Sequence, residues 1–131
     1  MPTKHDLGYK ELFSHPKLVQ ELLEAFVPLD FVDKVIANIL NVVSLQYGNY
    51  DSVLWRSAEG IEQFRPLATA NPTSGTPNHL EENPSIKIEF SIPRDEKLLY
   101  RVIQEGITPA HPWEEPVILI GEEMETRQSF D

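Results

Sequence analysis

The sequence predicts a single α+β domain in which helices pack against a sheet. Two stretches, at 32–43 and 98–103, carry apolar residues at the spacing of an amphipathic helix. Between them, every second residue from Ile86 to Ile92 is apolar, which is the pattern of a half-buried strand. The chain has 131 residues, 40% of them hydrophobic, which suffices for one core but not for two ordinary domains.

The first element, around Val19 to Phe26, has two interpretations. Its apolar residues fall at helical spacing, and Ser14 followed by Pro16 is a good helix start. The run from Leu22 to Val27 is also nearly continuous in apolar residues, and it fits a buried strand that ends at Pro28. The length of the segment favours a helix, so the periodicity leaves both interpretations open.

A helix and a strand are predicted next. Asp30 is a suitable N-cap, and the apolar residues from Val32 to Val43 form one stripe along a helix. The segment from Tyr50 to Arg56 is rich in aromatic and β-branched residues, which predicts a strand. Gly48 and Asn49 indicate a bend just before it.

The second half begins with the least regular part of the chain. Residues 58–84 contain four prolines and two glycines, which predicts a long loop of functional or interfacial character. After the alternating strand, the helix at 98–103 is expected to end at Gly106 as its C′ residue. A short buried strand at 117–120 and an acidic tail at 122–131 follow. With a strand as first element, the order is βαββαβ, that of a ferredoxin-like sandwich with both helices on one sheet face.

Composition narrows the classes of function. The formal net charge of −10 disfavours nucleic-acid binding, which needs a basic footprint. The absence of cysteine removes disulfides, thiolate metal sites and thiol catalysis. No apolar run has the length of a membrane span, and the first residues lack the order of a signal peptide, so we expect a cytoplasmic protein.

Several short motifs carry a resemblance over about residues 26–122. They are Phe-Val-Pro at 26–28, Gly-Asn-Tyr-Asp at 48–51, Gln-Phe-Arg-Pro at 63–66, Asn-Pro at 71–72 and His-Pro-Trp-Glu-Glu-Pro at 111–116. This series resembles the CutA-like, PII-like domain of YqfO-type proteins, in the GTP cyclohydrolase I type 2-like (NGG1p-interacting factor) family. The resemblance implies a ferredoxin-like fold, a tendency to form trimers and no established catalytic activity for this domain.

A different resemblance covers residues 4–28, which look like the opening of Rpn-type transposase and nuclease proteins of the PD-(D/E)xK group. We therefore divide the chain into a helical N-terminal extension, residues 1–25, and a CutA-like domain with an acidic tail, residues 26–131. The alternative function is a degenerate or partial nuclease that acts on DNA, with Asp51, Glu89 and Lys87 as its metal-binding set. Lys87 precedes Glu89 instead of following it, and the charge also argues against this alternative.

The segment 111–116 is the first candidate site. His111, Glu114 and Glu115 offer an imidazole and two carboxylates, which suit a divalent ion such as zinc, copper or manganese. The competing interpretation is structural: His111 sets a turn, Trp113 packs, and the glutamates cap the strand or face an interface. A divalent metal is therefore the one cofactor that the sequence suggests.

The second candidate site comprises Gln63, Phe64, Arg65 and Trp113, as ligand-binding or interface residues. The Arg65 guanidinium can bind an anion such as a phosphate or carboxylate. The competing interpretation pairs Arg65 with a nearby acid. A third interpretation joins the two sites, with Arg65 paired to Glu114 or Glu115 within a subunit or across two.

These observations predict a non-catalytic module that senses a ligand or drives oligomerisation, so no catalytic residue is assigned. We expect a homo-oligomer, with a trimer favoured, because association buries sheet edges that a lone subunit leaves unpaired. The long loop and the acidic turn would then lie near subunit boundaries. A small molecule, a small anion or a divalent metal could bridge the chains there.

Overall fold

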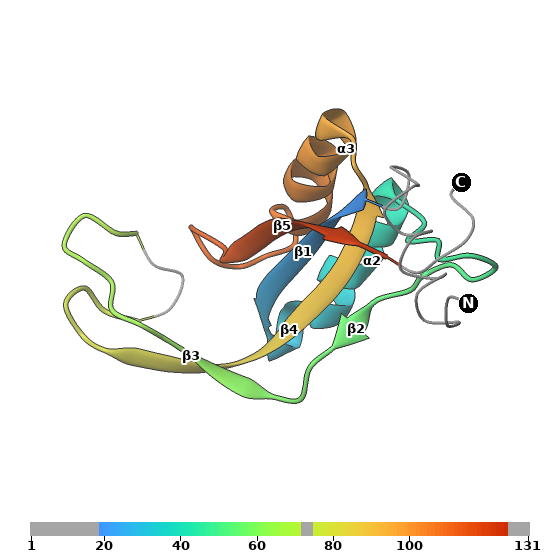
Figure 1. Cartoon of the computed structure of the whole chain (residues 1–131). Helices are drawn as coiled ribbons and strands as arrows, with labels where there is room; N and C mark the ends of the chain where they lie inside the picture. Colours follow the sequence, from blue (N-terminus) through green and yellow to red (C-terminus); the bar gives the residue numbers. More distant parts are fainter. Residues whose placement is uncertain (1–18, 72–74, 126–131) are drawn as a thin grey trace, which may run out of the picture.

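The computed structural model describes residues 19–71 and 75–125 (Figure 1). Residues 1–18 of the predicted helical N-terminal extension and residues 126–131 of the predicted acidic tail lie outside the described residues. The elements are β1 (Val19–Pro28), η2 (Leu29–Phe31), α2 (Val32–Val42), β2 (Trp55–Arg56), β3 (Gly60–Phe64), β4 (Glu81–Pro93), α3 (Glu96–Arg101), η3 (Val102–Ile107) and β5 (Ile118–Met124). Here η2 is a 3-10 turn and η3 is a π-helical turn that continues α3.

The strands form one antiparallel sheet in the order β2-β4-β1-β5, with β3 also paired to β4. The register is such that Leu23 of β1 lies opposite Phe90 of β4 on one side and Ile120 of β5 on the other. Figure 1 shows α2 and α3 on the same side of this sheet. The structure thus confirms a mixed fold with an antiparallel sheet and two helices.

The first element is a strand, so the helical interpretation of Val19 to Phe26 is wrong. Leu23, Ala25 and Val27 are fully buried, and they alternate with residues that are only half-buried. This period of two arises because successive side chains of a strand point to opposite faces, and one face of β1 lies in the core. The domain boundary predicted between residues 25 and 26 falls inside β1.

The helices supply the other half of the core. Val32, Val35 and Ile39 of α2 are buried at helical spacing, as the sequence predicts. The N-cap position is Phe31 and not Asp30, because the chain first makes the η2 turn, and no side chain caps this end.

The second helix runs further than the sequence predicts. Asp95 caps it by accepting hydrogen bonds from the backbone N–H groups of Lys97 and Leu98, at 2.9 and 3.3 Å. Gly106 does not end the helix but lies inside η3, where a Cβ atom would stand 3.3 Å from the Cα of Ile39. Its glycine character therefore serves the close approach of η3 to α2.

The segment between α2 and β4 differs most from the prediction. Only Trp55 and Arg56 of the expected strand 50–56 pair with the sheet, because Tyr47 and Tyr50 close a separate turn. The expected loop 58–84 contains β3 and the start of β4, which pair from Gly60 opposite Ser85 to Phe64 opposite Glu81. This hairpin extends away from the body of the domain as an arm (Figure 1).

Pro84 did not signal this strand because proline is rare inside a sheet. It is tolerated here because β1 ends at Pro28, opposite Ser85, so the arm part of β4 has only β3 as a neighbour. Pro84 is therefore compatible with β4 beginning earlier than the sequence predicts.

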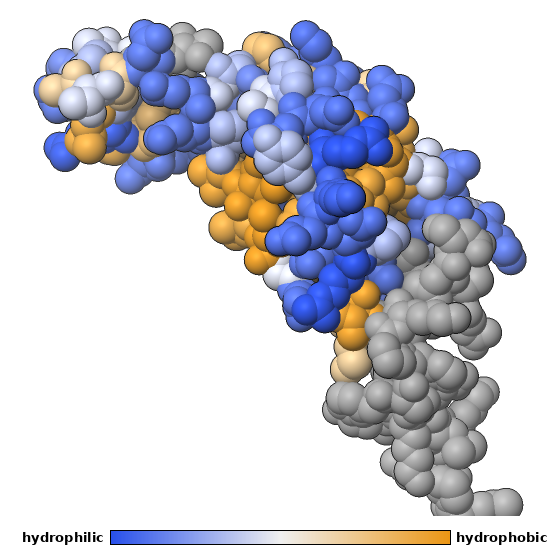
Figure 2. Space-filling model, turned by 90° about the horizontal axis from the view of Figure 1, so that it is seen from above, coloured by the Kyte–Doolittle hydropathy of each residue, from blue (hydrophilic) through white to orange (hydrophobic). Residues whose placement is uncertain are grey.

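The last strand, β5, is poorly covered. It pairs with β1 alone among the strands of the described residues. Leu119 and Ile120 point to opposite faces as sequence neighbours in a strand, yet they are 51% and 47% exposed. Val117 and Met124 are also exposed. The view in Figure 2 shows hydrophobic areas lying open on the body of the molecule.

Within the described residues, no helix is long and apolar enough to cross a membrane.

Candidate functional site

A pocket of about 450 Å³ lies between the arm and the loop that leads into β5. Its lining comes from two segments some fifty residues apart in the sequence, at 62–70 and 113–117. The lining residues are Glu62, Gln63, Phe64, Arg65, Pro66, Leu67, Thr69, Ala70, Trp113, Glu114, Glu115 and Val117. The structure therefore brings the two predicted sites together, with all of their residues except His111 in one lining.

Two aromatic rings join the segments. The ring centroids of Phe64 and Trp113 are 5.2 Å apart, and their planes are tilted by 56°. The ring of His111 meets that of Trp113 edge-on, with centroids 5.5 Å apart. Tilted and edge-on contacts of this kind are favourable beyond the apolar area that they bury. Phe64 and Trp113 thus fix the arm to the loop before β5, and we call their contact the aromatic bridge.

His111 contacts the Trp113 side of this bridge and is itself buried. The backbone N–H of Trp113 donates to His111 Nδ1 at 3.2 Å, so Nδ1 must be the unprotonated nitrogen. Nε2 therefore carries the hydrogen and donates to the carbonyl oxygen of Phe26, in β1, at 2.8 Å. Burial lowers the pKa of His111, and the hydrogen bond to Phe26 offsets part of this shift.

This geometry bears on the predicted metal site. Both ring nitrogens of His111 are engaged within the chain, so metal binding would require one of these hydrogen bonds to break. Glu114 and Glu115 are exposed in the loop that follows His111. In the part of the chain that the structure describes, no group of three or more His, Asp or Glu side chains could hold a metal ion.

Charged groups of both signs line the pocket. The sequence suggested an ion pair between Arg65 and Glu114 or Glu115, but within residues 19–71 and 75–125 Arg65 has no ion-pair partner. Glu114 instead accepts a hydrogen bond from the backbone N–H of Asn71, at 3.1 Å, through Oε2. This bond ties the segment that follows Arg65 to the acidic loop, and Arg65 itself is exposed.

Glu62 is a pocket residue that the sequence did not reveal. Its Oε1 atom is shielded from solvent and has no hydrogen-bond partner among the described residues. Burial raises the pKa of this carboxyl, and a hydrogen bond from the Ser85 side chain lowers it by a smaller amount. The strand β3 was not predicted, so no pattern indicated that Glu62 would turn inward beside Phe64.

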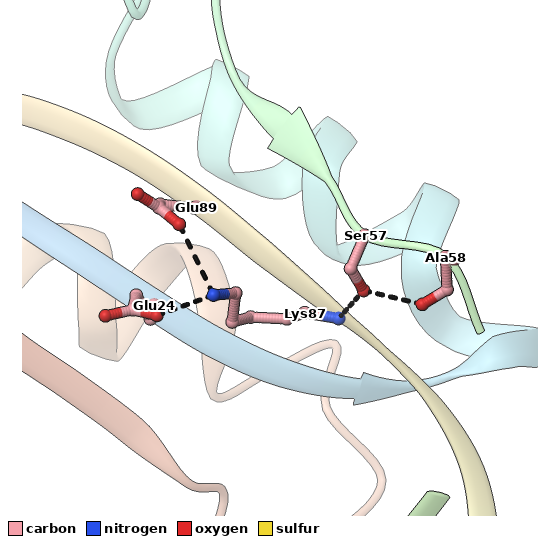
Figure 3. A network of polar contacts seen from close by, with 5 residues as sticks. All are labelled: Glu24, Ser57, Ala58, Lys87 and Glu89. Atoms are coloured by element: carbon pink, nitrogen blue, oxygen red, sulfur yellow. Dashed lines mark hydrogen bonds and ion pairs between the residues drawn. The ribbon is translucent and has the colours of Figure 1, made fainter. Parts of the chain in front are cut away.

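A second polar cluster lies on the sheet, away from the pocket (Figure 3). Lys87 Nζ lies 2.9 Å from Glu24 and 3.4 Å from Glu89, and 5.5 Å from the centroid of the Trp55 ring. The hydrogen bond to Glu24 is the main cause that raises the pKa of Lys87. Asp51 lies elsewhere, in an exposed segment where its carboxylate accepts a hydrogen bond from Ser52. Lys87 contacts Glu89, but among the described residues no hydrogen bond or ion pair joins either of them to Asp51.

Comparisons with known proteins support the likeness to GTP cyclohydrolase 1 type 2 homologs, but not the CutA/PII part of that resemblance or the likeness to PD-(D/E)xK nucleases. The chain is 35% identical over 99 residues to a GTP cyclohydrolase 1 type 2 homolog of Staphylococcus aureus strain Mu50, and 32% identical over 96 residues to that of Listeria monocytogenes. These matches cover 72% and 73% of this chain. No protein-family profile matches the chain.

A solved structure shows the same likeness. The Bacillus cereus protein related to NIF3 superposes with a TM-score of 0.65 at 25% identity, over 80% of this chain. The chain spans only about a quarter of the length of these relatives: 25% of the two homologs and 26% of the solved chain. It is therefore similar in sequence and in fold to one segment of the NIF3-related proteins.

Proposed function

We propose that this chain is a non-catalytic module that senses a small ligand and associates with itself, as a counterpart of one segment of the NIF3-related proteins. We also assign it the ferredoxin-like fold of the CutA and PII type. The strand order β2-β4-β1-β5, with both helices on one sheet face, supports this assignment.

The ligand site in this proposal is the pocket beside the aromatic bridge. The observation that carries it is that two motifs, singled out separately in the sequence, line the same cavity. The volume of about 450 Å³ lies in the range of small-molecule sites, and aromatic walls with a few polar groups are typical of them. Arg65 supplies the positive charge for an anionic group of the ligand.

Self-association in this proposal uses β5. Among the described residues β5 lies at the edge of the sheet, and an edge strand with exposed apolar side chains is a liability that assembly removes. Leu119, Ile120 and Met124 lie along this strand and Val117 lies at its start, so pairing with a second chain at this edge would reduce the exposure of apolar side chains on both faces. Val117 also lines the pocket, which would place the ligand next to a subunit boundary. A closed trimer is the assembly that we favour.

Light scattering of the full chain, coupled to size-exclusion chromatography at tens of micromolar, tests the assembly. A mass of three chains is expected, and a strict monomer would rule the assembly out.

The ligand site is tested by titrating inorganic phosphate into the protein and following the fluorescence of Trp113 in a Trp55→Phe background, since phosphate is a simple probe for Arg65. A saturable change that Arg65→Gln abolishes is expected, and the matched control is Arg101→Gln, whose guanidinium pairs with Glu105.

A further inference from the structure

We propose that the pocket beside the aromatic bridge binds a small zwitterion, namely an α-amino acid with an aromatic or large apolar side chain. This inference rests on the proposed function, because it names the ligand class for the same pocket. Two features carry it: charged groups of both signs in one lining, and an apolar wall.

The charges come first. Arg65 has no ion-pair partner among the described residues, and the carboxylates of Glu114 and Glu115 line the same cavity. A ligand with only an anionic group would face these carboxylates, and one with only a cationic group would face Arg65. Desolvating a charge without a partner is costly, so a ligand with both signs fits the lining better than either.

The ammonium group of such a ligand finds its acceptors in Glu114 and Glu115, whose carboxylates are exposed and belong to residues of the lining. An ammonium group carries three donors and no acceptor. It can therefore donate to the glutamates of the loop, while the ligand carboxylate pairs with Arg65.

The apolar wall selects the side chain. Phe64, Trp113, Leu67 and Val117 contribute aromatic and aliphatic surface to the lining. A ring or a branched aliphatic chain against this wall gains free energy from the apolar area that it buries. A polyphosphate gains nothing there and brings several negative charges next to Glu62, Glu114 and Glu115, which disfavours it.

The test uses the full chain with Trp55→Phe, so that Trp113 is the fluorescent reporter, and compares matched ligands by titration. Phenylalanine and leucine are the zwitterions, phenethylamine lacks the carboxylate, 3-phenylpropionate lacks the ammonium, and glycine lacks the side chain. We expect phenylalanine to bind at least about tenfold more tightly than each analogue, since each analogue loses one charged or apolar contact worth about 1.4 kcal/mol.

Two pocket variants assign the contacts. Arg65→Gln should bring phenylalanine down to the affinity of phenethylamine, and Glu115→Gln should bring it towards that of 3-phenylpropionate. Arg101→Gln, outside the pocket, should leave all affinities unchanged. The inference is overturned if a single-charge analogue binds as tightly as phenylalanine, or if only phosphate binds in an Arg65-dependent way; the ligand site would then stand. If no probe binds, both proposals fail.

Discussion

Replacement of His111 by alanine should loosen the link between β1 and the pocket. The substitution removes the hydrogen bond from Nε2 to the Phe26 carbonyl, at 2.8 Å, and the one that Nδ1 accepts from the Trp113 N–H, at 3.2 Å. Each is worth about 1 kcal/mol net, and the lost edge-on contact with the Trp113 ring adds up to about 1 kcal/mol.

The expected loss in free energy of unfolding is therefore about 3 kcal/mol. For a chain of this length a change of 1 kcal/mol moves the Tm by about 4 °C, so the Tm should fall by about 12 °C. Circular dichroism measures the Tm, and Trp113 fluorescence in the Trp55→Phe background reports whether the indole leaves the aromatic bridge.

His79→Ala is the matched control, because His79 is an exposed histidine in the loop before β4. Its substitution should change the free energy of unfolding by less than about 0.5 kcal/mol. A loss below about 1 kcal/mol for His111→Ala, or an unchanged Trp113 signal, would refute the inferred role of His111 in holding the pocket wall.

Three further predictions concern pH, packing and assembly. Burial lowers the pKa of His111 in the folded state, so its contribution to stability is complete above the unfolded pKa of about 6.5 and is lost as the pH falls through the folded pKa. His111→Ala should therefore make the Tm less dependent on pH between pH 7 and 5. An unchanged dependence of the Tm on pH would contradict this prediction. Gly106→Val forces a side chain against Ile39 and should cost about 1–3 kcal/mol in chemical denaturation, whereas Gly121→Val, which meets open space, should cost little; equal costs would argue against the close approach. Leu119→Glu puts a charge on the exposed edge strand and should reduce the mass in light scattering to that of one chain, whereas an unchanged oligomer would exclude β5 from the interface.

Periodicity predicted the regular elements well where one face is buried. The stripe of α2 and the alternation in β4 both came from side chains that pack into the same core, so their spacing records the geometry of the element. The strand β1 was ambiguous because a central strand with apolar residues on both faces does not alternate clearly in polarity.

The arm could not be predicted in the same way. Glu62 lies in β3 and Pro84 in the arm part of β4, and these two segments pair with each other away from the core, so no apolar alternation marks them. The candidate site was therefore predicted as two separate motifs, and their meeting at Phe64 and Trp113 depends on how the arm bends towards the loop before β5. That distance between segments is a tertiary property, which local sequence does not encode.

Heteronuclear NMR of the labelled full chain, titrated with phenylalanine, tests the central claim most directly, because each amide reports its own surroundings. The account predicts saturable shifts at the Trp113 indole N–H and at the amides of Phe64 and Arg65, with little change around Lys87. Shifts that cluster on the sheet near Lys87, or that leave Trp113 unperturbed at saturation, would contradict the assignment of this pocket as the ligand site.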